Sequence, residues 1–129
     1  MSDASGNEKL EAARAMRRRV LGDEYVDRAT AVTGAAAELQ DHITSMAWGV
    51  WTREGPLSLR DRSLLVLAMT AALGRMEEFR LHARASVNTG VTDDELDELL
   101  FQIAAYAGAP AAVAARREIA ELRAERDRS

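Results

Sequence analysis

Apolar residues recur every three or four positions along most of the chain, and no segment alternates between apolar and polar residues as a strand would. The stretches from Leu39 to Val50 and from Leu96 to Ala107 show this spacing well. Alanine and leucine dominate the apolar residues, and both favour helices because neither loses much side-chain freedom there. The sequence therefore predicts an all-α fold.

Glycines and capping residues divide this pattern into six or seven expected helices. Ser58 stands three residues before Asp61, and Thr92 stands three residues before Glu95, which is the spacing of a capping box. Glycines then mark where helices should stop. The expected helices cover residues of about 8–21, 23–33, 35–51, 58–73, 75–89, 92–107 and 110–126, with glycines 22, 34, 74, 90 and 108 between them.

The length of 129 residues fits one domain. Met1 to Asn7 is small and polar, so residues 1–7 are expected to be a disordered leader and residues 8–127 a single helical domain. The leader lacks the apolar core of a secretory signal. The longest strongly apolar stretch, Leu64 to Leu73, falls short of the roughly 20 residues that span a bilayer. We therefore expect a cytoplasmic protein without a membrane segment.

The Leu64–Leu73 helix is apolar nearly all round, which is typical of a helix buried in the fold or in a subunit interface. We expect it to pack mainly against the Leu96–Ala107 helix. The net charge of -4, with interleaved signs, argues against nucleic acid as a partner. The absence of cysteine excludes disulfides, thiolate nucleophiles and iron–sulfur clusters. Two distant histidines without clustered carboxylates predict no metal site.

Arg75, Glu78 and His82 share one face of an expected helix, because they lie three and four residues apart. A carboxylate beside an imidazole raises its pKa and orients it. A guanidinium one turn away can hold a substrate carboxylate. The triplet could therefore combine a proton donor with an anion anchor, although ordinary ion pairs on a solvated face would give the same spacing.

Two further pairs of residues allow both a functional and a structural interpretation. Arg60 and Arg62 begin the Leu64–Leu73 helix, where cations oppose the helix dipole, so they could bind an anion or pair with an acidic residue. Trp48 and Trp51 lie three apart on one helix and could wall a pocket for a flat ligand, or simply pack in a core or interface.

Blocks of sequence spread over residues 14–120 resemble one known family in order and with near-constant spacing. They are residues 19–23, 26–29, 47–49, 51–53, 60–75, 77–82, 88–92 with Glu95, and 106–112. The block from Leu73 to His82 and the block from Tyr106 to Ala112 are the most specific. The family is that of gamma-carboxymuconolactone decarboxylase.

The resemblance implies an alkyl hydroperoxidase D-like, all-α fold that assembles into trimeric or hexameric rings, with sites near subunit interfaces. It implies a cofactor-free decarboxylase that converts 4-carboxymuconolactone to 3-oxoadipate enol-lactone and CO2 in protocatechuate catabolism. The peroxidase-like branch needs a Cys-x-x-Cys pair and is excluded. Under this resemblance His82, oriented by Glu78, would be the acid, and Arg75 with Arg60 or Arg62 would supply the cation.

The resemblance also suggests where substrate contacts would lie. Trp48 or Trp51 would form an apolar wall, and Gln102 and Tyr106 would contact the substrate. Gln102 stands where the family usually has histidine. Val113 and Val50 replace a common asparagine and glutamate, the latter in a segment one residue shorter. These departures leave two alternatives: a related decarboxylase or cyclase that acts on another small carboxylated substrate in a biosynthetic pathway, and a non-catalytic ring-forming protein.

Overall fold

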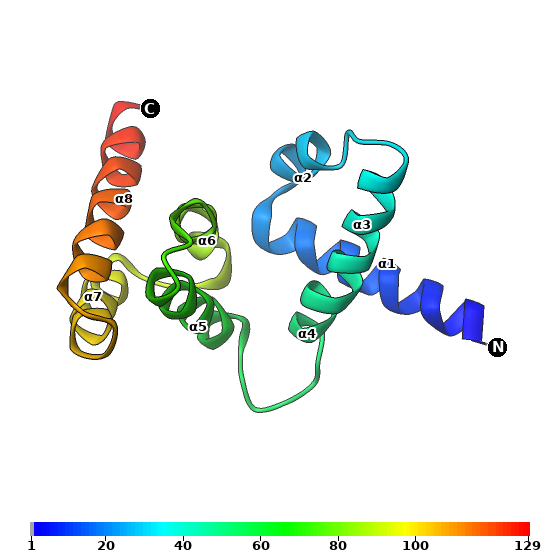
Figure 1. Cartoon of the computed structure of the whole chain (residues 1–129), viewed down its shortest axis with the longest axis horizontal. Coiled ribbons are helices and arrows are strands. Elements are labelled where there is room, and N and C mark those ends of the chain that lie inside the picture. Colours follow the sequence, from blue (N-terminus) through cyan, green and yellow to red (C-terminus); the bar gives the residue numbers. More distant parts are fainter. Residues whose placement is uncertain (1) are drawn as a thin grey trace. The chain divides into compact units, whose positions relative to one another are not determined.

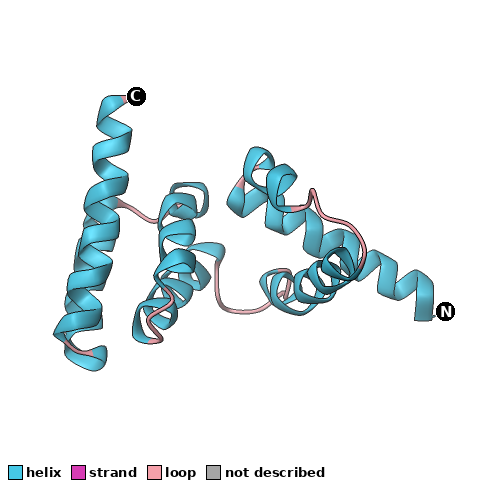
Figure 2. Ribbon diagram, turned by 45° about the horizontal axis from the view of Figure 1, so that its top comes forward, coloured by secondary structure: helices cyan, strands magenta, loops and turns pink. Residues whose placement is uncertain are grey.

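The computed structural model describes residues 2–129, and within them the side chains of residues 5–129; this described part is helical and contains no strand (Figure 2). It has seven helical segments when the uninterrupted run over residues 35–51 is counted once. The predicted all-α fold is confirmed. The chain divides into two compact units, Met1–Pro56 and Leu57–Ser129.

The first unit contains four α-helices and one π-helix (Figure 1): α1 Ser2–Leu21, α2 Asp23–Ala29, α3 Ala35–Ile43, η1 Thr44–Trp48 and α4 Gly49–Trp51. Helix α1 packs against η1, α2 and α4. Its buried side chains include Ala13 and Val20. Between these two residues, arginines of α1 bind carboxylates of α2 and α3. Helix α1 therefore has one apolar, buried face and one charged face.

Helix α1 begins earlier than the sequence predicts. It starts at Ser2 instead of Glu8, so residues 2–7 of the expected leader are helical, and Met1 lies outside the described residues. Adding a turn to an existing helix costs far less than nucleating one, which accounts for this extension. The prediction of a single domain over residues 8–127 stays a prediction.

The helix expected over residues 35–51 is uninterrupted, but it changes type in the middle. A π-helical segment, Thr44–Trp48, separates α3 from α4. Trp48 and Trp51 stack with ring centroids 5.1 Å apart and an interplanar angle of 30°. Both are buried, at 8% exposure. The tryptophan pair therefore packs in the core of the first unit.

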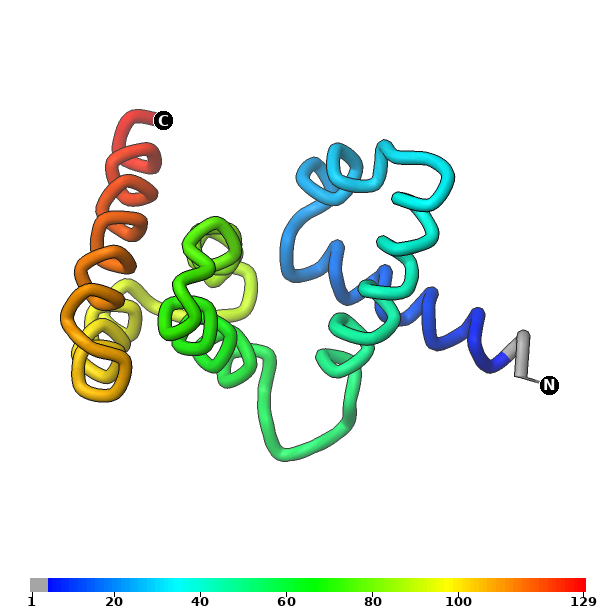
Figure 3. The backbone as a smooth tube through the Cα atoms, in the orientation of Figure 1, coloured from blue at the N-terminus to red at the C-terminus, as the bar shows by residue number. Residues whose placement is uncertain are grey.

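The second unit consists of four helices (Figure 3): α5 Leu59–Ala72, α6 Met76–Thr89, α7 Asp93–Ala107 and α8 Ala109–Arg128. Its core is one cluster of buried side chains in which all four helices and the α6–α7 connection take part. The buried members are Leu67, Ala71, Phe79, Ala83, Val91, Leu96, Leu99, Ile103, Ala115 and Ile119.

Both predicted capping boxes are present. Ser58 Oγ accepts a bond from the Asp61 backbone N–H at 3.1 Å, and the Ser58 N–H donates to Asp61 Oδ2 at 3.2 Å. Thr92 and Glu95 make the equivalent pair of bonds at 3.1 and 2.9 Å. These boxes fix where α5 and α7 begin because each satisfies two otherwise unpaired donors.

The pairing of helices differs from the expected one. Helix α5 packs most extensively on α6, and α7 on α8, while α5 and α7 share a smaller contact. The expectation that α5 and α7 form the main pair was therefore wrong, because short connections place each helix beside its neighbour in sequence. Leu65 and Met69 on α5 and Leu73 at its C-cap stay 42%, 58% and 73% exposed, so the apolar surface of α5 is only partly covered within the chain.

Within residues 2–129, no helix combines the length and apolar character needed to cross a membrane.

Candidate active site

Arg75, Glu78 and His82 lie along the first half of α6. Arg75 is the N-cap residue of α6, and its side chain is exposed. Glu78 lies in the first turn and is also exposed. His82 follows one turn later and is mostly covered. The three groups thus run from solvent at Arg75 toward the interior of the second unit at His82.

His82 has an environment opposite to the one expected from its neighbour Glu78. Burial lowers the pKa of His82 from its ordinary 6.5 to about 4, and the attraction of the Glu78 carboxylate opposes this shift without overcoming it. The expectation that Glu78 would leave His82 with a raised pKa was therefore wrong. At neutral pH the imidazole is uncharged, with one ring nitrogen as donor and the other as acceptor.

The face of α6 that carries His82 is turned toward α5. Thr89 lies seven residues after His82 on this face, and its Oγ1 lies 2.6 Å from Ser63 Oγ on α5. Ser63 is itself buried, at 1% exposure. Helix α5 thus packs on the face of α6 that carries His82, and the sequence spacing within α6 could not reveal this packing.

The two arginines at the start of α5 have different partners. Arg60 pairs with Asp61 at 3.3 Å and with Glu95 on α7. Arg62 is half-buried, and it makes no side-chain hydrogen bond or ion pair with residues 5–129. Its guanidinium therefore lacks a counter-charge in the described part of the chain. Of the two, Arg62 is the one able to bind a substrate carboxylate without breaking an existing pair.

An ion-pair network holds α6 against α8. Arg80 Nη1 lies 2.7 Å from Glu118, Arg80 Nη2 lies 2.6 Å from Glu125, and Arg80 also contacts Glu121. Hydrogen bonds to these carboxylates raise the pKa of Arg80. Sequence reasoning missed this network, because it requires knowing that α6 and α8 are neighbours. It holds α8 against the helix that carries His82.

The remaining predicted site residues lie on α7 and in the first unit. Gln102 and Tyr106 lie exposed on α7, Tyr106 at 87%. Neither makes a side-chain hydrogen bond or ion pair with residues 5–129. Trp48 and Trp51 belong to the first unit, whereas His82 belongs to the second. Contact of these four residues with substrate therefore stays a prediction.

Cavities are present in both units. One of about 580 Å³ is formed by α1, α2, α3 and the start of η1; one of about 690 Å³ lies between α6, α7 and α8; and one of about 560 Å³ lies along α7 and α8. Arg75, Glu78 and His82 line none of these three. The first cavity contains a cation, Arg17, that sequence reasoning did not single out, although the run Arg17-Arg18-Arg19 marks its position.

The sequence model of the carboxymuconolactone decarboxylase family matches residues 37–121. The chain belongs to this family. The 4-carboxymuconolactone decarboxylase of Acinetobacter baylyi is 44% identical over 102 residues, which are 78% of this chain and 75% of that protein. The nitrosuccinic acid decarboxylase of Metarhizium robertsii is 39% identical over 102 residues, which are 78% of this chain and 71% of that protein.

Membership of the carboxymuconolactone decarboxylase family confirms the resemblance found in the sequence. Both relatives are named decarboxylases, so the chain is a carboxy-lyase of this family. The two names give different substrates, a carboxylated lactone and a nitro acid. The family thus accounts for the class of reaction and leaves the substrate to be argued from the site.

Proposed function

We propose that this protein is a cofactor-free decarboxylase that converts 4-carboxymuconolactone to 3-oxoadipate enol-lactone and CO2, a step of protocatechuate catabolism. The observation that carries the proposal is the 44% identity to a 4-carboxymuconolactone decarboxylase over 78% of the chain. The presence of Arg62, Arg75 and His82 on α5 and at α6 is consistent with it, because the reaction needs cations for carboxylates and a donor for a developing oxyanion.

The reaction breaks the bond between the ring and its carboxylate. The electron pair of that bond moves through the ring double bond into the lactone carbonyl, and CO2 departs. The resulting dienolate then takes a proton on carbon, which water supplies to the site. Catalysis therefore consists of stabilising negative charge on the lactone oxygen and delivering that proton.

His82 suits the first of these tasks. Because its pKa is lowered to about 4, the imidazole is neutral at physiological pH, and the ring does not carry the second, acidic proton of an imidazolium. A neutral imidazole can still polarise a carbonyl by donating its ring N–H. In our proposal His82 donates its ring N–H to the lactone oxygen as charge develops there, and Glu78 orients the ring.

Arg62 and Arg75 suit the binding of carboxylates. Arg75 is exposed at the entrance to α6, and Arg62 is half-buried at the start of α5. Neither makes a side-chain ion pair with residues 5–129. A guanidinium can hold a carboxylate with two parallel hydrogen bonds. In our proposal these arginines hold the carboxylate that stays on the substrate.

A second substrate has a specific observation in its favour. The chain is 39% identical to a nitrosuccinic acid decarboxylase over 102 residues. A nitro group can accept an electron pair from a breaking carbon–carboxylate bond as a lactone carbonyl does. Gln102 and Val113, which depart from the family pattern, make a different small carboxylated substrate a consistent alternative.

Purified protein should be given 4-carboxymuconolactone and, separately, nitrosuccinate, with loss of substrate followed by ultraviolet absorbance. We expect turnover of the lactone, and a drop of about 10²-fold or more for His82→Ala. His42→Ala is the matched control, because His42 is the other histidine and lies exposed on α3. Turnover of nitrosuccinate alone would replace the proposed substrate, and turnover of neither would favour the non-catalytic alternative.

The homo-oligomer implied by the family resemblance is also a proposal. Leu65, Met69 and Leu73 follow one another at helical spacing and are exposed on α5. Exposed apolar side chains gathered on one helix are typical of a protein–protein contact. A trimer or hexamer, measured by light scattering after gel filtration, would support this assembly, and a monomer at micromolar concentration would contradict it.

A further inference from the structure

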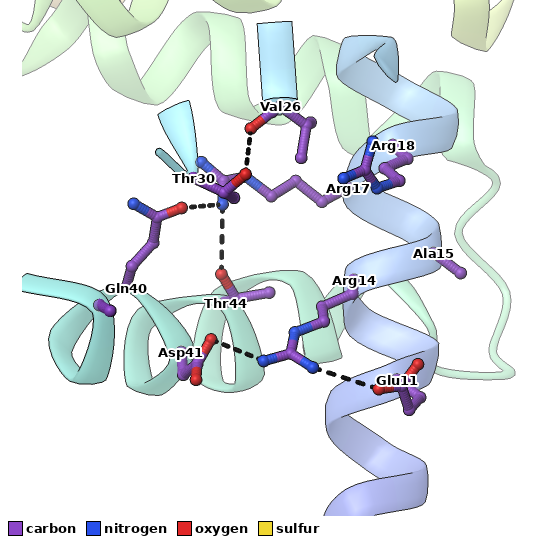
Figure 4. A pocket seen from close by; sticks show the side chains of 11 residues that line it. Glu11, Arg14, Ala15, Arg17, Arg18, Val26, Thr30, Gln40, Asp41 and Thr44 are labelled. Carbon is purple, nitrogen blue, oxygen red and sulfur yellow. Dashed lines mark hydrogen bonds and ion pairs between the residues drawn. The ribbon is translucent and has the colours of Figure 1, made fainter. Parts of the chain in front are cut away.

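The cavity in the first unit is the most strongly built polar site outside α6 (Figure 4). It has a volume of about 580 Å³ and is lined by α1, α2, α3 and Thr44, the first residue of η1. This volume lies within the range of small-molecule sites in proteins. A π-helical segment often marks a functional position, and here it begins in the cavity wall.

Three arginines of α1 line the cavity, and two of them are neutralised by carboxylates. Arg14 lies 3.1 Å from Glu11 and 2.9 Å from Asp41. The hydrogen bond that Arg14 donates to the Asp41 carboxylate raises the pKa of Arg14. Arg18 pairs in the same way with two aspartates, at 3.2 Å and 2.9 Å, just beyond the cavity wall. The carboxylates of this region are therefore already in use.

Arg17 is the third of these arginines, and its position is different. It makes no ion pair with residues 5–129. Its Nη1 donates to Gln40 Oε1 at 2.8 Å and, more weakly, to Thr44 Oγ1 at 3.5 Å, and both acceptors are neutral. Its Nε is buried without an acceptor in the described part of the chain. A full positive charge is thus half-buried without an anion, which is a costly arrangement.

The surroundings hold Arg17 in place instead of neutralising it. Gln40 Nε2 donates to the Ala29 carbonyl at 2.8 Å, and this bond turns Gln40 Oε1 toward Arg17. Thr44 is 3% exposed, and its hydroxyl can donate to a ligand while it accepts from Arg17. Figure 4 shows the Arg17 side chain crossing from α1 to Gln40 and Thr44. The guanidinium is therefore pre-oriented, as a binding group should be.

We propose that this cavity binds a small carboxylate-bearing molecule, whose carboxylate accepts hydrogen bonds from the Arg17 guanidinium and the Thr44 hydroxyl. The lining contains three guanidinium groups and two carboxylates, Glu11 and Asp41. Arg14 and Arg18 are already paired with carboxylates, so only the single charge of Arg17 is left for a ligand, which suits a singly charged carboxylate better than a doubly charged phosphate. A carboxylate also matches the planar guanidinium with two parallel bonds. This site stands independently of the decarboxylase proposal.

The test is a titration of the full-length protein with sodium acetate and sodium succinate, against sodium chloride at equal ionic strength. The backbone amide resonances of Gln40 and Thr44 report occupancy. We expect saturable shifts for wild type and binding about tenfold weaker or worse for Arg17→Gln. Arg19→Gln is the matched control: Arg19 is exposed on the same helix, lies outside the cavity and should leave binding unchanged.

Two results would overturn the site: no saturable shift in wild type, or equal weakening in Arg17→Gln and Arg19→Gln. If Arg17→Gln fails to fold, Thr44→Val removes the hydroxyl without changing side-chain size, and unchanged binding in that variant would also overturn it. Turnover assays separate the two sources of the carboxylate. A raised KM in Arg17→Gln identifies the substrate's own carboxylate, whereas an unchanged KM with carboxylate binding lost identifies a separate small acid.

Discussion

Glu78 and His82 lie one turn apart on α6, and burial of the imidazole outweighs the attraction of the carboxylate. The pKa of His82 is therefore lowered to about 4 and not raised. This relationship changes the chemistry available to the site, because a neutral ring donates a hydrogen bond without supplying a labile proton. It also makes His82 a measurable probe of folding.

The lowered pKa of His82 predicts how stability depends on pH. In the unfolded chain the imidazole has its ordinary pKa of 6.5, so between pH 6.5 and about 4 the unfolded state binds more protons. Stability should fall as the pH falls through this window, by about 3 kcal/mol in total from this group. The free energy of unfolding, measured by urea denaturation at several pH values in this window, should fall with pH more steeply for wild type than for His82→Gln.

His42→Gln is the control for that comparison, because it removes the exposed histidine of α3. It should keep the wild-type pH dependence. If His82→Gln also keeps it, His82 is not buried in the neutral form.

Glu78 should have a smaller effect of opposite sign on the same group. Its carboxylate raises the pKa of His82, so Glu78→Gln should lower that pKa further. The His82 ring C–H resonance, followed by NMR across acidic pH, measures the change. Glu77→Gln removes the adjacent charge from another face of the first turn and should leave the titration near its wild-type position. An upward movement in Glu78→Gln would contradict the assignment.

The two arginines at the start of α5 should separate binding from stability. Arg62 has no ion pair with residues 5–129, so Arg62→Gln should raise KM for a carboxylated substrate about tenfold or more and leave the melting temperature nearly unchanged. Arg60 pairs with Glu95 in the capping box of α7, so Arg60→Gln should cost up to about 1 kcal/mol of stability. Steady-state kinetics and thermal melts distinguish the two variants. A raised KM in Arg60→Gln with lost stability in Arg62→Gln would show that Arg60 binds the substrate and Arg62 stabilises the fold.

Gly90 should tolerate substitution poorly. It ends α6 in the left-handed conformation, with φ of 90° and ψ of 19°. A Cβ has space there, so the cost of Gly90→Ala should come from the backbone alone, at about 1 kcal/mol. Gly55→Ala is the matched control because Gly55 has open space and no positive φ. Equal stability of the two variants, measured by urea denaturation, would contradict this account.

Sequence patterns predicted the local features of this protein well. The starts of α5 and α7 follow from Ser58 with Asp61 and from Thr92 with Glu95, because each capping box involves residues three apart. Gly90 ends α6 for a similarly local reason. The family could be recognised because its motif blocks are local as well.

Long-range features could not be predicted in the same way. The burial of His82 depends on the packing of other helices around α6, which no spacing within α6 reveals. Arg17 is one of three consecutive arginines, and only the fold shows that Arg17 is half-buried without a carboxylate partner. The network of Arg80 with α8 depends on residues about forty positions away. In each case the deciding partner lies on another helix.

The π-helical segment has a consequence for how this part of the chain can vary. A π turn takes in one more residue than an α turn, so η1 sets the angular offset between Gln40, which precedes it, and the stacked tryptophans, of which Trp48 ends η1 and Trp51 follows it. Point substitutions leave that offset intact, whereas a one-residue deletion inside η1 would rotate everything beyond it by about a quarter turn. Length variation in this short segment, more than residue identity, would therefore decide whether the cavity wall and the tryptophan core can coexist.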